Sequence, residues 1–330
     1  MLRIYLDQAK WIDLSKCRAG RRDGDRFRDV YAVASEAVRG GHASFVLSCA
    51  HYYETHHRAG AKSRAELADT MAELSQFHTL APPMVVVPAE IEQFLTGRPV
   101  TEQVNLFGVG IEHAFDADFG FSAPTTESDR VPSELRSEAK RRASWLIERT
   151  MPAGQSTLVP GLDQRVLDTA RTLKNASQKF VDSQNAVADY ITANKIRHPD
   201  RLADVVPASE IADFIDPLLA GCNRNGIDAQ ALLQNQDSMQ KLLRGLPSRW
   251  VTSELRRARL RNPQKAWEKN DLNDLLALST AVPYCGVVVT ENEWAHHLTQ
   301  LGLADRYGTI VLADLTELTD VLVAASVQAS

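Results

Sequence analysis

Four acidic residues stand at comparable positions near the two ends of the chain. Asp7 and Glu291 each directly follow a short apolar run. Glu54 comes a few residues after a third such run, and Asp274 opens an apolar helical pattern. Carboxylates that lie close together repel one another unless they share a cation or a proton. Because no cluster of His or Cys with ligand spacing accompanies them, we expect Mg²⁺ or Mn²⁺ rather than zinc.

A divalent cation held by such residues has a specific chemical use. It lowers the pKa of a bound water and neutralises the charge that develops on a phosphoryl group under attack. A phosphodiester needs both effects, so the sequence predicts a metal-dependent nuclease. The expected catalytic residues are Asp7, Glu54, Asp274 and Glu291. The expected metal ligands are Asp7, Asp271, Asp274, Glu291 and Glu293, of which Asp271 is an alternative to Asp274 and Glu293 an alternative to Glu291.

Each of these residues also has an ordinary structural explanation. An Asp after a strand is often a loop or cap residue, and Glu54 alone would be part of a solvated helix face. One of Asp271 and Asp274 is expected only to favour a helix N-terminus through the helix dipole. The functional interpretation therefore depends on the joint placement of these residues.

Such a site needs a framework that brings the ends of separate strands together. Short apolar runs predict strands at 2–6, 44–47, 286–290 and 309–312. Apolar residues at helical spacing predict helices at 25–39, 271–282 and 293–301. Strands that alternate with helices in this way predict an α/β fold with a parallel sheet covered on both faces. The C-terminal ends of parallel strands share one edge, where ligand sites gather.

The middle of the chain has a different, mainly helical pattern. One short strand is predicted at 84–87. The predicted helices are 64–79, 133–150, 162–195, 208–221 and 228–244. We interpret residues 1–62 and 262–330 as one α/β core, with 63–261 as a helical insertion. A separate helical middle domain is the competing description.

The acidic motifs resemble those of the PIN-domain nucleases over about residues 1–60 and 262–330. Members of that family have a strand that ends in Asp, as in Leu6-Asp7 here. They also have a Glu on the helix after the second strand, as at Glu54.

The two later motifs are the more specific part of this resemblance. The third is an Asp that opens a helix of small and apolar residues, here Asp274-Leu275-Leu276-Ala277-Leu278-Ser279-Thr280-Ala281. In the fourth, a strand runs into Thr and an acidic turn, here Val288-Val289-Thr290-Glu291-Asn292-Glu293, where the family usually has Asp. The resemblance implies a PIN-like three-layer α/β/α sandwich with a central parallel sheet. It also implies a divalent metal and hydrolysis of phosphodiesters, most often in RNA.

These inferences lead to an endoribonuclease that acts on single-stranded RNA. Asp7, Asp274 and Glu291 would bind Mg²⁺ or Mn²⁺, and Glu54 would bind it or orient the attacking water. The alternatives are a structure-specific DNA nuclease and a nucleic-acid-binding module with an inactive PIN-like core. A second copy of the chain, an antitoxin or a defence protein as partner is left open by the sequence.

A basic stretch leads into the third acidic motif and could guide a phosphate backbone. Within 241–269, basic residues far outnumber Glu254 and Glu268, and two tryptophans are interleaved. The expected nucleic-acid-binding residues are Arg256, Arg257, Arg259, Arg261, Lys265 and Lys269. A charged, solvated helix is the alternative interpretation.

The overall composition limits the remaining classes. The 330 residues carry a net charge of -5, so any nucleic-acid surface must be local. No apolar run reaches the ~20 residues of a membrane span, and we expect a soluble, cytoplasmic protein without membrane partners. The spacing of His51 and His56 places them on poorly matched helix faces for a shared zinc ion.

Overall fold

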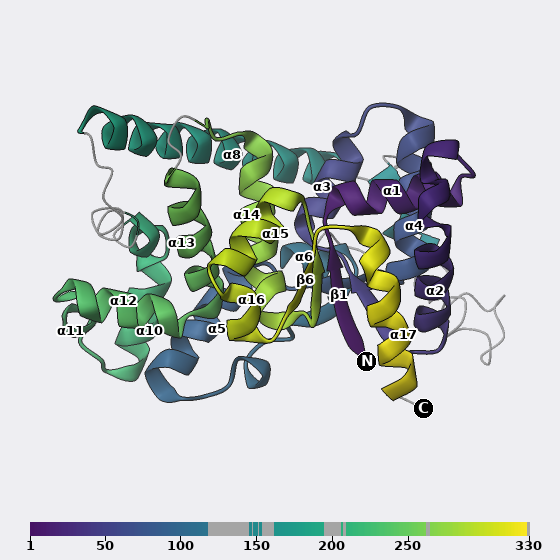
Figure 1. Ribbon diagram of the computed structural model, residues 1–330. Helices are drawn as coiled ribbons and strands as arrows, with labels where there is room; N and C mark the ends of the chain where they lie inside the picture. The colour runs from purple at the N-terminus through teal and green to yellow at the C-terminus, as the bar shows by residue number, and fades with distance from the viewer. Residues whose placement is uncertain are drawn as a thin grey trace, which may run out of the picture. The chain divides into compact units, whose positions relative to one another are not determined.

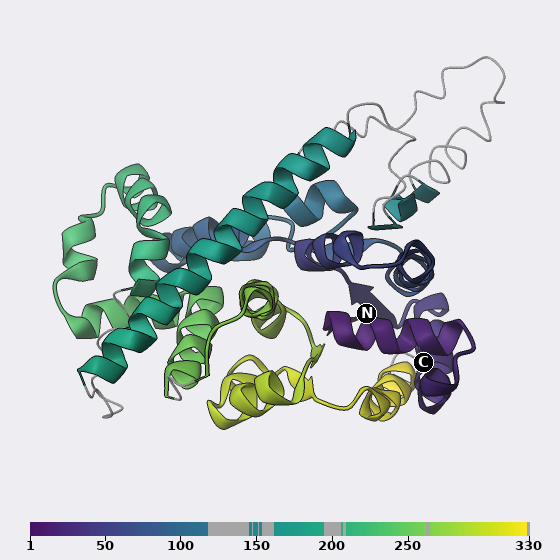
Figure 2. The same cartoon turned by 90° about the horizontal axis from the view of Figure 1, so that it is seen from above.

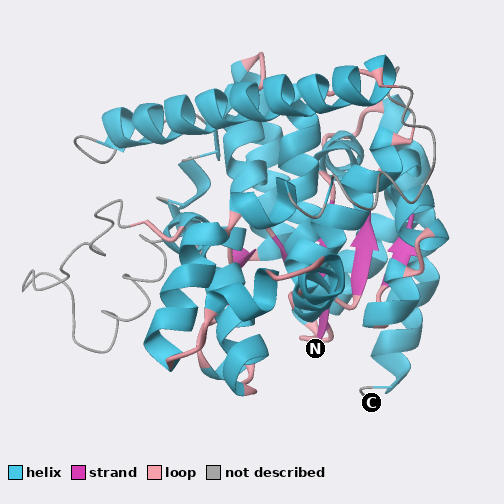
Figure 3. Ribbon diagram, turned by 90° about the vertical axis from the view of Figure 1, so that its left-hand side faces the viewer, coloured by secondary structure: helices cyan, strands magenta, loops and turns pink. Residues whose placement is uncertain are grey.

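Helices are far more frequent than strands in the computed structural model (Figure 1, Figure 3). The described residues are 1–117, 145–146, 148–150, 152–153, 162–194, 206, 209–261 and 265–328. The main sheet has four strands in the order β2-β1-β5-β6. The predicted α/β class with a mainly parallel sheet is therefore confirmed.

The strands form at the apolar runs, and their register is regular. They are β1 (Leu2–Leu6), β2 (Ala43–Val46), β3 (His78–Leu80), β4 (Phe107–Val109), β5 (Val287–Val289) and β6 (Ile310–Leu312). β1 pairs in parallel with β2, with Leu2 opposite Ala43. β5 pairs in parallel with β6, with Val287 opposite Ile310, whereas β3 and β4 are antiparallel. Every residue of β2 and β5 is buried, as expected for strands covered on both faces.

The chain divides into two compact units. The first comprises residues 1–80, 107–173 and 314–330. The second comprises residues 81–106 and 174–313. Both ends of the chain therefore belong to the first unit, which holds β1 and β2, while β5 and β6 belong to the second.

Amphipathic helices accompany the strands of the first unit. In α2, the buried residues Val30, Ala34 and Ala37 lie one turn apart on a single face. The C-terminal helix α17 packs against α2 (Figure 1). The helical elements of this unit include α1 (Gln8–Arg18), η1 (Arg22–Phe27), α2 (Arg28–Arg39), α3 (Cys49–His57), α4 (Ala61–Ser75), α6 (Ile111–Phe115), η4 (Leu315–Glu317) and α17 (Leu318–Gln328).

The second unit has a helical core centred on α5. Val87 and Ile91 of α5 pack with Leu218, Leu242 and Leu246. The long helix α8 (Leu162–Ala193), teal in Figure 2, contributes its residues from 174 onward to this unit. Its other helical elements are α5 (Pro83–Thr96), η2 (Val100–Glu102), α10 (Ile215–Asn225), α11 (Ala229–Leu233), α12 (Gln236–Gly245), α13 (Pro247–Leu260), α14 (Lys269–Tyr284), α15 (Asn292–Gln300) and α16 (Leu303–Tyr307).

The strand predicted at 84–87 is wrong, because these residues lie in α5. Pro83 begins this helix, at a position where the missing N–H of proline leaves no hydrogen bond unmade. The β-branched run favours a strand when considered alone. In the protein, α5 packs against α10 and α13, and this tertiary packing makes the segment helical.

Most of the other predicted elements are present. The helices predicted at 25–39, 64–79, 162–195, 228–244, 271–282 and 293–301 correspond to η1 with α2, α4, α8, α11 with α12, α14 and α15. The helix predicted at 208–221 overlaps α10, and the one at 133–150 lies mostly outside the described residues. No helix in the described part of the chain is both long and apolar enough to cross a bilayer.

Candidate functional site

Asp7 caps the helix that follows β1. Its backbone is extended, and its carboxylate Oδ1 accepts a hydrogen bond from the main-chain N–H of Ala9 at 3.3 Å. The residue is only 7% exposed. An acidic N-cap satisfies an otherwise unpaired N–H of the first turn and interacts favourably with the helix dipole. Asp7 is therefore a helix cap, as its position after a strand would explain without any chemical role. A chemical role would come in addition to this one.

His51 joins the start of α3 to the end of β1. The main-chain N–H of Ser48 donates to Nδ1 of His51 at 2.9 Å, so Nδ1 is an acceptor and Nε2 carries the proton. Nε2 then donates to the main-chain oxygen of Leu6 at 2.8 Å. Burial lowers the pKa of His51 to about 4. The imidazole is neutral and both nitrogens are engaged, which removes His51 from the possible metal ligands.

The segments that carry Asp7 and Glu54 are held together by two hydrogen bonds. Leu6, directly before Asp7, accepts the bond from His51 described above. Gln8, directly after Asp7, donates through Nε2 to Oγ1 of Thr55 at 2.9 Å, and Thr55 is the neighbour of Glu54 on α3. The first unit thus brings the first and second acidic positions of the sequence into one neighbourhood.

Asp274 and Glu291 lie on segments that are joined in the second unit. A carboxylate oxygen of Asp274, on α14, accepts a hydrogen bond from Nε1 of Trp294 at 2.9 Å. Trp294 is buried in the first turn of α15, and Glu291 is the N-cap residue of that helix. The indole therefore connects the third acidic motif to the turn that contains the fourth.

Asp271 and Glu293 are bound to a buried arginine. The guanidinium of Arg259 donates to Asp271 at 2.7 Å and to Glu293 at 3.1 Å. Asp271 also accepts from the main-chain N–H of Glu268 at 2.7 Å, in a capping box at the start of α14. Lys265 forms a second ion pair with Glu293. These two carboxylates therefore have internal structural roles.

The pKa shifts of these two groups follow from the same contacts. Burial raises the pKa of Asp271 and outweighs the effects of the Glu268 N–H and of Arg259. Burial also acts on Glu293, but there the hydrogen bond from Lys265 and the charge of Arg259 outweigh it and lower the pKa. The ionised form of Glu293 is thus stabilised by its cations.

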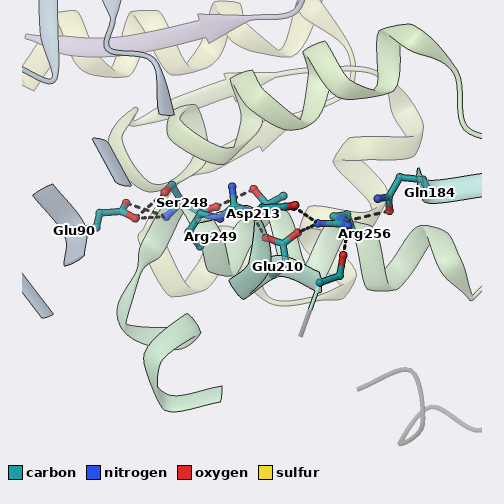
Figure 4. Close-up of polar contacts among 9 residues, drawn as sticks. Glu90, Gln184, Glu210, Asp213, Ser248, Arg249 and Arg256 are labelled. Carbon is teal, nitrogen blue, oxygen red and sulfur yellow. Dashed lines mark hydrogen bonds and ion pairs between the residues drawn. The ribbon is translucent and has the colours of Figure 1, made fainter. Parts of the chain in front are cut away.

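Two residues of the basic stretch point into the protein rather than to solvent. Arg256 is 3% exposed and donates to Gln184 at 3.1 Å, to Asp213 at 2.9 Å and also to Glu210 (Figure 4). Arg259 is 4% exposed and holds the acidic pair described above. These two guanidiniums are therefore not exposed to solvent, contrary to the expectation from the sequence.

The other members of the stretch are more exposed. Arg257 and Lys265 form ion pairs with Glu254 and Glu293, respectively. Arg261, which follows α13, is exposed. The side chain of Lys269 lies outside the described residues. A phosphate-binding surface on this stretch would consequently depend on Arg257, Arg261 and Lys265.

The donor chemistry of the candidate site is that of carboxylate oxygens. Within the described ranges, no group of three or more His, Cys, Asp or Glu side chains is placed to hold a metal ion. The contacts above assemble the acidic segments in pairs, one pair in each unit. Carboxylate pairs suit hard divalent cations such as Mg²⁺ and Mn²⁺.

Sequence reasoning missed the tie between His51 and Leu6 and the one between Trp294 and Asp274. The spacing of Ser48 and His51, three residues apart at a helix start, indicates the helix cap but not the bond from His51 to Leu6, which lies 45 residues earlier. The hydrogen bond from Trp294 to Asp274 joins two different helices, and no local sequence pattern predicts it.

Comparisons with known proteins return no matching family model, no similar curated protein and no similar solved structure. The likeness to PIN-domain nucleases thus depends on the acidic motifs themselves. The described geometry supports a coarse α/β class with a mainly parallel sheet.

Proposed function

We propose that this chain is a metal-dependent endoribonuclease with a PIN-like three-layer core, acting on single-stranded RNA. Asp7, Asp274 and Glu291 would bind Mg²⁺ or Mn²⁺, and Glu54 would bind the cation or orient the attacking water. The observation that carries the proposal is the pairing of acidic segments by hydrogen bonds in each unit. In the first unit the pair is Asp7 with Glu54, and in the second it is Asp274 with Glu291.

The pairing in the first unit supports the proposal because it is specific to the residues around the carboxylates. Both neighbours of Asp7 in the sequence are bound to α3, one on each side of Glu54. A neutral, buried His51 holds the strand end without adding a positive charge beside the acids. Two negative charges kept in one neighbourhood cost stability unless they meet a cation or a proton.

In the second unit, the contacts of Arg259 favour one choice among the alternatives. Asp271 and Glu293 are neutralised by Arg259 and Lys265, so a cation would gain less from them. We therefore assign the ligand roles to Asp274 and Glu291. The indole N–H of Trp294 fixes one oxygen of Asp274 and orients that carboxylate.

A bound divalent cation would supply acidification of a water and neutralisation of charge on the phosphoryl group. The chain's own residues would orient the reactants around it. The Ala9 N–H holds Oδ1 of Asp7, so the carboxylate has a fixed direction. Glu54, partly exposed on α3, would accept a proton from the attacking water.

The proposal is tested by incubating the full chain with labelled single-stranded RNA, single-stranded DNA and branched DNA. Each substrate is combined with Mn²⁺, with Mg²⁺ and with EDTA. We expect cleavage of the RNA with either metal and none with EDTA. Cleavage of branched DNA alone would favour the structure-specific DNA nuclease, and retention of RNA without cleavage would favour the binding module. Absence of metal-dependent cleavage of every substrate would remove the nuclease proposal.

A further inference from the structure

A cavity of about 390 Å³ lies within the second unit, lined by residues of α8, α13 and α14. Its volume falls in the range of roughly 300–1,000 Å³ that is usual for small-molecule sites. One wall is apolar and consists of Leu272, Leu275 and Leu276 with the ring of Phe180. The three leucines are spaced so that they share one face of α14. This wall can accept the apolar or aromatic part of a ligand.

The rest of the lining includes charged residues, and Arg256 is the fixed one among them. Nε of Arg256 donates to Gln184, and its two terminal nitrogens donate to Glu210, Asp213 and Ser209 (Figure 4). A guanidinium with all three nitrogens engaged is held in one orientation. Arg256 therefore shapes the cavity, and a ligand would not need to contact it.

Arg249 also lines the cavity. It donates to Glu210 at 2.5 Å and lies 3.7 Å from Asp213. Its Nε is buried and has no hydrogen-bond partner in the described part of the chain. A buried N–H without an acceptor is uncommon because the lost bond to water is not replaced. Because this N–H is enclosed by protein, Arg249 offers the cavity the positive charge of its 12% exposed side chain rather than a free donor.

Lys179 adds a positive charge at the exposed side of the cavity. Among the described residues, no ion pair joins it to a carboxylate. Three cations line the cavity, Lys179, Arg249 and Arg256, and two carboxylates, Glu210 and Asp213, form ion pairs with the two arginines. This leaves one positive charge in excess, which matches a ligand with a single negative charge.

We propose that this cavity binds a small organic monoanion with an apolar or aromatic body. The anionic group would contact Lys179 in the field of the Arg249 charge, and the body would lie against the three leucines. The shared chemistry is one negative charge next to an apolar group. Two sources carry it: a free organic carboxylate, and one phosphodiester unit of a nucleotide chain. The proposal does not depend on the nuclease activity.

The test measures binding to the full chain by isothermal titration calorimetry at physiological salt. 4-Phenylbutyrate represents the free carboxylate, and a dinucleoside monophosphate represents the nucleotide unit. 4-Phenylbutyramide lacks the charge, and inorganic phosphate lacks the apolar body. We expect one of the first two probes to bind, which identifies the source, and we expect the last two to bind far more weakly.

Two substitutions and one matched control locate the binding. Lys179→Glu should weaken binding of the active probe by about tenfold, because it reverses one nearby charge. Leu276→Trp should fill the cavity and remove binding. Lys241→Glu makes the same charge change on α12, outside the cavity lining, and should leave the affinity within about twofold, since distant exposed charges are screened.

Three results would overturn the proposal. The first is no binding of either monoanionic probe at millimolar concentration. The second is binding that neither Lys179→Glu nor Leu276→Trp weakens. The third is equal binding of inorganic phosphate or of the uncharged amide. Because Lys179 is exposed, its variant should fold like the wild type, and circular dichroism checks this.

Discussion

Nε2 of His51 donates a 2.8 Å hydrogen bond to the main-chain oxygen of Leu6, the last residue before Asp7. The bond runs from the first turn of one helix to the end of a strand that lies more than forty residues earlier in the sequence. The strand end that presents an acidic residue is therefore fixed by a side chain with no charge. The same imidazole accepts from the N–H of Ser48, so its protonation would break a helix cap as well.

The stability of the protein should depend on pH through His51. Its pKa is lowered from 6.5 to about 4 in the folded chain, so its stabilising contribution is present above 6.5 and lost as the pH falls through 4. The full contribution is about 3 kcal/mol. Urea unfolding of wild type and His51→Gln at pH 7 and pH 5 measures it. The wild type should have the larger free energy of unfolding at pH 7. The difference between the two proteins should be smaller by about 2 kcal/mol at pH 5. An advantage that stays constant would mean that His51 does not titrate in this range.

Asp7→Asn should remove metal-dependent cleavage of RNA while keeping the fold. Asn caps helices about as well as Asp, so the melting temperature should stay level or rise as a negative charge is lost. Its amide is a poorer ligand for a hard cation. Single-turnover cleavage with Mn²⁺ and thermal melting without metal are the two measurements.

Asp228→Asn is the matched control for that variant. Asp228 caps α11 and accepts from the N–H of Gln230, two residues on, as Asp7 does from Ala9. It should retain wild-type cleavage. If both variants cut RNA at the wild-type rate, Asp7 is only a helix cap. If Asp7→Asn unfolds, its role is structural.

The contribution of Glu90 to the stability of the protein should depend on pH in the direction opposite to that of His51. It is fully buried and accepts from the N–H and Oγ of Ser248 and from the hydroxyl of Tyr284, and burial raises its pKa to about 7. Its contribution is present below the ordinary pKa of 4.5 and lost as the pH rises through 7. Glu90→Gln should therefore gain stability relative to wild type between pH 5 and pH 8, by up to about 3 kcal/mol.

The control for this prediction is Glu92→Gln on the same helix. Glu92 is partly exposed and binds Arg224 and Asn225. This variant makes the same acid-to-amide change on α5 at a position that is not fully buried. Urea unfolding across pH 5–8 gives both comparisons, and parallel curves for Glu90→Gln and wild type would contradict the assignment.

Arg256 should matter for stability rather than for RNA binding. Arg256→Gln removes one of the two arginines that bind the fully buried Glu210 and leaves Arg249 as the other, so the loss of its charged hydrogen bonds should cost about 1.5–3 kcal/mol. Arg261→Gln, at an exposed position, should change stability by no more than about 0.5 kcal/mol. Chemical denaturation compares the two. A mild effect of Arg256→Gln with a flatter salt dependence of RNA binding would return Arg256 to the nucleic-acid surface.

The sequence predicts those parts of the fold that depend on local pattern. The strands at 2–6 and 44–47 are recognisable because their residues are apolar and β-prone, and the structure places strands there. The run at 84–87 has the same character, yet Pro83 and contacts with distant helices make it helical. Local composition could not decide between these outcomes, because the deciding partners lie more than a hundred residues away.

The candidate site shows the same boundary between local and long-range information. The position of Asp7 after a strand is a local property. The burial of Arg256 is not, since it depends on Gln184 and Glu210, which lie 72 and 46 residues earlier in the chain. A row of arginines in a sequence looks the same whether it faces solvent or internal carboxylates. The expectation that Arg256 and Arg259 face solvent was wrong for this reason.

The return of the C-terminal segment to α2 has a consequence for how the protein is made. Residues 314–330 belong to the first unit, although the whole of the second unit precedes them in the chain. A ribosome therefore releases the last part of the first unit only after it has synthesised residues 174–313. The face of α2 that α17 covers stays exposed to solvent during that interval. Nascent chains with exposed apolar faces are prone to aggregate. The second unit, in contrast, can be complete before synthesis ends.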